Sequence, residues 1–211
     1  MDFGPIGRQS MVTAELYIEG GGDNRQQHSK ALRIRFRQGW NAFFKSAGLG
    51  GRMPKVVRGG GRQQTFERFA IAIAEGHPRI VPLLLVDSEN PVAAGHSVWQ
   101  HLQANDNWNR PLNAGDDQAF LMVQVMETWF LADRNSLRHH FGAKFKENAL
   151  RQWPQLEAVP KATVFDALER ATDKGYAKGK VSFELLAQID PARVEAVCPH
   201  AKAFMKRLRT L

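Results

Sequence analysis

The chain has 211 residues, of which 43% are hydrophobic and 24% charged, so it is long enough for one domain with a buried core and too apolar to be intrinsically disordered. Its formal net charge of +8 favours an anionic partner such as nucleic acid, a membrane surface or an acidic protein, and a solvated basic face fits it equally well. A single cysteine, Cys198, excludes an internal disulfide and a zinc cluster, and no apolar run is long enough to span a membrane. We therefore expect a cytoplasmic protein in which Cys198 is a buried structural thiol.

The first part of the chain alternates strand and helix patterns. Residues 1–11 show no periodic pattern and are interpreted as an N-terminal extension. Apolar runs predict strands over 12–19, 53–57, 80–86 and 120–126, and apolar spacings of three and four predict helices over 29–47, 65–75 and 95–104. This order is typical of a mainly parallel sheet of about four strands with right-handed crossovers, an α/β fold over residues 12–134.

The rest of the chain is predicted to be a basic helical region, residues 135–211. Residues 138–211 contain 14 Lys or Arg against 8 Asp or Glu, which is +6 of the total +8. Residues 105–117 are rich in Asn, Asp and Gly and predict an exposed loop, in which Trp108 would be available to stack on unpaired bases. Trp99 is expected in the core.

Three carboxylates are predicted to meet at one edge of the sheet. Glu19 follows the first strand, and Asp87 and Glu89 follow the third. In an open α/β sheet, side chains at the carboxyl ends of neighbouring strands converge on one crevice. A divalent cation would relieve their mutual repulsion, and Mg²⁺ or Mn²⁺ prefers carboxylate oxygen. Such a site would activate water or stabilise charge on a phosphoryl group.

The glycines after Glu19, in "EGGGD", carry less information by themselves. They match neither the GxGxxG dinucleotide fingerprint nor a phosphate-binding loop that ends in GK[ST]. A flexible turn explains them as well as a close approach of the backbone to a ligand does. Asp23, which follows them, is an additional acid that would reach a metal through water.

Taken together, "YIEGGGD" and "LLVDSEN" resemble the Toprim domain, the catalytic fold of topoisomerases, primases and OLD-type nucleases. That family places a glutamate after its first strand and an Asp-x-Asp pair after its third. The resemblance implies that Glu19, Asp87 and Glu89 are metal ligands, although Glu89 replaces the second Asp and adds a rotatable bond.

A narrower resemblance covers nearly the whole chain. The segments "ELYIEGGGD", "LLLVDSE", "QVMETWFLAD" and "YAKGKVSFELLAQID" resemble the domain of unknown function 4276 family, itself similar to RloB-like proteins and other Toprim-like anti-phage effectors. The resemblance implies a Mg²⁺-dependent endonuclease that acts on DNA or RNA. It also implies an effector of abortive infection, restrained or triggered by an ATPase partner.

Further residues become candidates downstream. Glu127 either caps a helix or joins the metal edge as a ligand or general base, and the family resemblance favours the second role. Asp133 is expected to cap the following helix. Lys178 lies on a glycine-flanked turn, where it would contact a phosphate or remain a solvated surface lysine; the resemblance keeps it as a catalytic candidate. A basic group around the second glycine cluster would hold a phosphate backbone or form a plain basic loop: Arg52, Lys55, Arg58 and Arg62.

Three functions follow from these patterns. The first is a metal-dependent phosphodiesterase. The second is a non-catalytic adaptor whose basic surface binds nucleic acid or an ATPase. The third is a nucleotide-binding regulator that uses the glycine turns.

Overall fold

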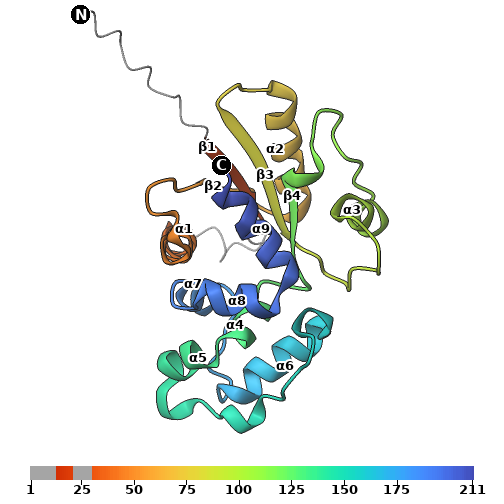
Figure 1. The fold of residues 1–211 in the computed structure, drawn as a ribbon. Helices are drawn as coiled ribbons and strands as arrows, with labels where there is room; N and C mark the ends of the chain where they lie inside the picture. Colours follow the sequence, from red (N-terminus) through yellow and green to blue (C-terminus); the bar gives the residue numbers. More distant parts are fainter. Residues whose placement is uncertain (1–12, 21–29) are drawn as a thin grey trace, which may run out of the picture.

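The computed structural model describes residues 13–20 and 30–211, and its centre is a parallel sheet of four strands in the order β2-β1-β3-β4 (Figure 1). The strands are β1 (Thr13–Ile18), β2 (Lys55–Arg58), β3 (Ile80–Asp87) and β4 (Ala119–Met122). The predicted α/β class with a parallel sheet is confirmed. The strand predicted over 120–126 is too long, because β4 ends at Met122, opposite the last residue of β3. Residues 123–126 therefore lie beyond the end of the sheet.

Helices cover both faces of the sheet. Side chains alternate along each strand, so Leu16 and Leu83 face α1 (Lys30–Phe44) and α9 (Pro199–Arg209), while Tyr17 and Leu84 face α2 (Arg62–Glu75) and α3 (Val98–Asp106). Both faces of the central strands are buried, which explains why β3 reads as a continuous apolar run.

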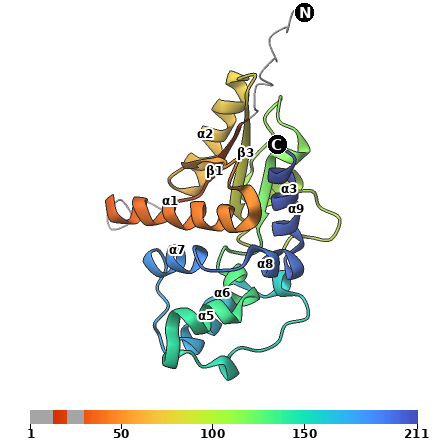
Figure 2. The ribbon, with the colours of Figure 1, turned by 60° about the vertical axis from the view of Figure 1, so that its left-hand side comes forward.

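The remaining helices form a layer against the carboxyl edge of the sheet, visible below the strands in Figures 1 and 2. They are α4 (Thr128–Ala132), α5 (Arg134–Phe141), α6 (Lys161–Ala171), α7 (Lys180–Leu186) and α8 (Pro191–Val197). Helix α7 runs along α1, where Gly39 is needed: a Cβ on it would lie 2.7 Å from the carbonyl oxygen of Phe183. One continuous hydrophobic core joins this layer to the sheet. Helix α9, which follows the layer in sequence, packs on β4.

The loop after α3 differs from its prediction. Trp108 is only 4% exposed, and its ring stacks on Phe66 with centroids 4.5 Å apart. Its Nε1 donates a hydrogen bond to Oε1 of Gln63 at 2.7 Å. The prediction of an exposed Trp108 is therefore wrong, because the first turns of α2 provide both an aromatic surface and an acceptor. Trp99 is buried, as predicted.

Two further expectations concern the thiol and the membrane. Cys198 is buried, and burial raises the pKa of its thiol to about 12, so it is the inert structural thiol that was predicted. Among the described residues, no helix has the length and apolar character needed to cross a membrane.

Candidate active site

A cavity of about 170 Å³ opens at the carboxyl edge of the sheet, between the strand ends and helices α1 and α7. Four of the predicted site residues line it: Glu19, Asp87, Glu127 and Lys178. Its apolar wall includes Trp40 and Met122. The structure thus brings together side chains from the ends of β1 and β3, from the start of α4 and from the turn before α7.

Asp87 is a buried acid at the centre of the predicted site. It is the last residue of β3 and is 8% exposed, and the backbone N–H of Met126 donates to its Oδ1 at 2.9 Å. Burial, followed by the negative charges of Glu127 and Glu19, raises the pKa of Asp87 well above its ordinary value, although Lys178 opposes the shift. A buried carboxylate surrounded by other carboxylates favours either a proton or a cation at this position.

Glu19 follows β1 and faces the same space. Its Oε2 is buried without a hydrogen-bond partner and lies 3.6 Å from Nη1 of Arg62. Burial raises the pKa of Glu19, and the Arg62 charge opposes that rise. The ion pair with Arg62 is long, so it leaves this oxygen available for a further ligand.

Arg62 is committed mainly to other groups. Its Nε and Nη2 bind the two carboxylate oxygens of Asp106 at 2.6 and 2.7 Å, and its Nη1 donates to the carbonyl oxygen of Asp87 at 2.5 Å. Its guanidinium carbon also lies 5.0 Å from the centroid of the Trp108 ring. The interpretation of these residues as a basic loop therefore did not anticipate the position of Arg62. This residue links β3 to α2 and α3 immediately behind the acids. No local signal distinguishes it from Arg58.

Glu127 is 1% exposed and binds a tyrosine. The hydroxyl of Tyr176 donates to Glu127 Oε1 at 2.7 Å, and Glu127 Oε2 is buried without a partner. Glu127 occupies the N-cap of α4 but makes no capping hydrogen bond with its side chain, which removes the capping interpretation. Burial and the Glu127 charge raise the pKa of Tyr176, so its hydroxyl keeps its proton and remains a donor.

Tyr176 and Ser182 were missed by the sequence reasoning. The Tyr176 hydroxyl lies 3.3 Å from Oγ of Ser182, which accepts the N–H of Gly179 at 2.7 Å. This network fixes the turn that carries Lys178. The segment "YAKGKVS" was quoted for its lysine, and the tyrosine and serine in it were the available signal.

Lys178 and Glu89 occupy different places at the cavity. Lys178 lines it, with Nζ 5.5 Å from the centroid of the Phe165 ring, and its charge opposes the rise in the pKa values of Asp87 and Glu19. Glu89 is not among the lining residues. It has a φ of 64° and forms an ion pair with Lys161 on α6. The backbone turns after Asp87, so Glu89 does not continue strand β3. Its carboxylate is bound by Lys161 in this ion pair.

Asp133 lies away from this group. It caps α5, accepting hydrogen bonds from the N–H and hydroxyl of Ser136. Burial alone would raise the pKa of Asp133. The hydrogen bonds from Ser136 and from the N–H of Asp190 outweigh burial and hold this pKa below its ordinary value. The predicted capping role is confirmed. Asp23 lies outside the described residues.

The donor set fits a small, hard cation with water in its coordination sphere. Over residues 13–20 and 30–211, no three acidic, histidine or cysteine side chains are placed so that they would ligate one metal ion together. Mg²⁺ often binds through one or two carboxylates and keeps several waters. Glu19 and Glu127, each with an Oε2 atom that has no hydrogen-bond partner, line one cavity with Asp87 and meet that requirement.

Comparison with known protein families gives a match that covers most of the chain. A family model described as "Domain of unknown function (DUF4276)" matches residues 24–209. No curated protein and no solved structure matches the chain.

Proposed function

Because the chain belongs to the DUF4276 family, whose description states no activity, we propose its function from the cavity: a metal-dependent phosphodiesterase that acts on nucleic acid. The likeness of "YIEGGGD" and "LLVDSEN" to Toprim motifs supports the same proposal. The observation that carries it is that Glu19, Asp87 and Glu127 line one cavity with two buried carboxylate oxygens unpartnered.

Each of the four predicted site residues that line the cavity has a role in this proposal. Glu19 and Asp87 would hold Mg²⁺ or Mn²⁺, which supplies activation of water and stabilisation of phosphoryl charge. Glu127, oriented by Tyr176, would accept the proton of the attacking water at Oε2. Lys178 would bind a non-bridging phosphate oxygen at the rim.

Glu89 has an indirect role in this scheme. The negative charge of Glu89 raises the pKa values of Glu19 and Asp87, so it favours a cation bound beside these two carboxylates. Glu89 itself pairs with Lys161 and does not line the cavity. We retain an ATPase partner and an anti-phage setting as part of the proposal, because uncontrolled cleavage would damage the host.

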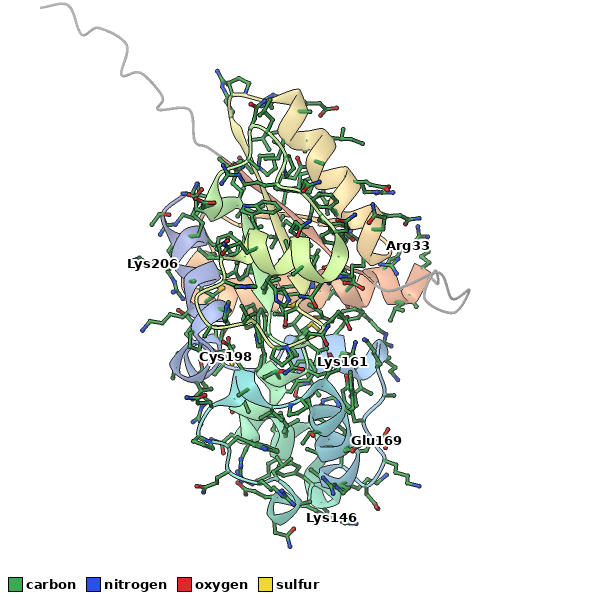
Figure 3. The ribbon with its side chains drawn as sticks, turned by 90° about the vertical axis from the view of Figure 1, so that its right-hand side faces the viewer. Arg33, Lys146, Lys161, Glu169, Cys198 and Lys206 are labelled. Carbon is green, nitrogen blue, oxygen red and sulfur yellow. The ribbon has the colours of Figure 1, made fainter. Side chains whose placement is uncertain are left out.

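The test measures cleavage and metal binding separately. Labelled single-stranded DNA, duplex DNA and RNA are incubated with the chain in Mg²⁺, Mn²⁺ or EDTA. Glu127→Gln is expected to reduce metal-dependent cleavage by roughly 100-fold or more, the usual contribution of a positioned general base. Glu169→Gln is the matched control, because Glu169 is exposed on α6 (Figure 3) and does not line the cavity.

Calorimetry keeps the proposal testable if cleavage requires a partner. The wild-type chain is expected to bind Mn²⁺, and Glu19→Gln is expected to weaken that binding. A wild-type chain that binds no Mn²⁺ overturns the proposal. Nucleic-acid binding without cleavage under any metal condition, alone or with its partner, would support the adaptor alternative instead.

A further inference from the structure

A second, strongly basic hollow of about 240 Å³ lies beside the acidic cavity. Its lining comes from the outer side of α1 and the end of β2: Lys30, Arg33, Ile34, Phe36, Arg37 and Arg58. Four of these residues are basic and none is acidic. The first half of α1, which carries most of them, extends past the edge of the sheet, with Arg33 near its outer end (Figures 2 and 3).

The positive charges of the basic side chains that line this hollow repel one another. Arg33 and Arg37 are separated by one helical turn and are both exposed. Like charges at this spacing destabilise a helix. Neither forms an ion pair with an acid among the described residues, whereas Arg35, on another side of α1, pairs with Glu184 of α7. Burial, and after it the positive charge of Arg33, lowers the pKa of Arg58.

The hollow borders the acidic cavity directly. Arg58 Nε donates to the carbonyl oxygen of Gly20 at 2.8 Å, and Gly20 lines the acidic cavity next to Glu19. A Cβ on Gly20 would lie 2.1 Å from Cγ of Arg58. The Arg58 side chain therefore passes so close to the backbone at residue 20 that only glycine leaves room for it. Helix α1 also borders both spaces, since Leu32 lines one and Arg33 lines the other.

We propose that this hollow is a phosphate-backbone subsite, in which Arg33, Arg37 and Arg58 bind phosphates of the nucleic-acid strand flanking the bond in the acidic cavity. The inference rests on the proposed function and specifies how that site takes its substrate. Arginine suits the role because its planar fork matches phosphate oxygens. Ile34, 46% exposed in the same hollow, offers an apolar contact to a sugar or a base.

The test measures the affinity for a short fluorescein-labelled single strand by fluorescence anisotropy. Every protein carries Asp87→Asn, so that the strand is not cleaved. The variant is Arg33→Ala/Arg37→Ala. The control is Lys202→Ala/Lys206→Ala, which removes two exposed charges with the same spacing from α9, on the opposite side of the molecule (Figure 3).

Counterion release sets the expected size of the effect. Loss of two phosphate contacts on a single strand reduces the salt slope by about 1.4, which corresponds to roughly 25-fold weaker binding at ~0.1 M salt. The control pair is expected to change binding less than about threefold, since its charges act only at long range. Arg33→Lys/Arg37→Lys keeps both charges and is expected to recover most of the affinity.

The subsite is overturned if the two alanine pairs lose affinity for the strand equally. It is also overturned if Arg33→Ala/Arg37→Ala changes that affinity by less than about threefold. Cleavage by the wild-type protein is measured in parallel. Metal-dependent cleavage without a selective effect of the arginines overturns the subsite alone. A selective effect in a protein that never cleaves overturns the nuclease and leaves the subsite as the surface of an adaptor.

Discussion

Replacement of Asp87 by asparagine is expected to stabilise the metal-free protein, the reverse of the usual effect of changing a buried polar residue. Burial and neighbouring carboxylates raise the pKa of Asp87. The folded chain therefore binds a proton that the unfolded chain has released, between about pH 4 and the raised pKa. Stability falls as the pH rises through that window, and the loss is complete above it.

The magnitude follows from the contacts of Asp87. Asparagine keeps the Oδ1 acceptor for the N–H of Met126 and removes the charge that Glu127 and Glu19 repel. Removal of an uncompensated buried polar group is worth about 1–3 kcal/mol in proteins. For a chain of this size, each 1 kcal/mol shifts the melting temperature by roughly 2–4 °C. We therefore expect a rise of several degrees at neutral pH, and a smaller one below pH 5.

Thermal melts with and without Mg²⁺ check both parts of this reasoning. Ten-fold excess of Mg²⁺ over its dissociation constant adds about 1.4 kcal/mol to a protein that binds it only when folded. That gain is expected in the wild type and absent in Asp87→Asn. Asp166→Asn, exposed on α6, is the control. If Asp87→Asn melts below the wild type without metal, or gains equally from Mg²⁺, the electrostatic account of the site is wrong.

Three other changes test the contacts around the site. Tyr176→Phe leaves both oxygens of Glu127 unpartnered, and urea titration is expected to show a loss of about 1–3 kcal/mol that Glu127→Gln partly restores; an additive double mutant would contradict the contact. Trp108→Ala is expected to cost about 3–5 kcal/mol by the same titration, while a loss of oligonucleotide affinity without that destabilisation would reinstate base stacking. Gly20→Ala is expected to displace Arg58 and weaken oligonucleotide binding in the anisotropy assay; unchanged affinity would separate Arg58 from the subsite.

Residues near one another in sequence were sufficient to predict the fold class and the place of the central acids. Strands and helices follow from repeats of two and of three to four residues, which local sequence contains. Parallel strands all end at the same edge, so Glu19 and Asp87, each at the end of a strand, were expected to meet, and both line one cavity.

Only the tertiary structure decided which partners those acids have. Glu127 meets Tyr176 across 49 positions, Arg62 meets Asp106 across 44, and Glu89 meets Lys161 across 72. Such pairs depend on how α6, α7 and the loops pack against the sheet, and no local pattern specifies that packing. The same packing buries Trp108, which a polar stretch of sequence had marked as exposed. Local periodicity thus determined the elements and the edge where the acids lie, whereas helix packing decided which carboxylate oxygens remain unpartnered.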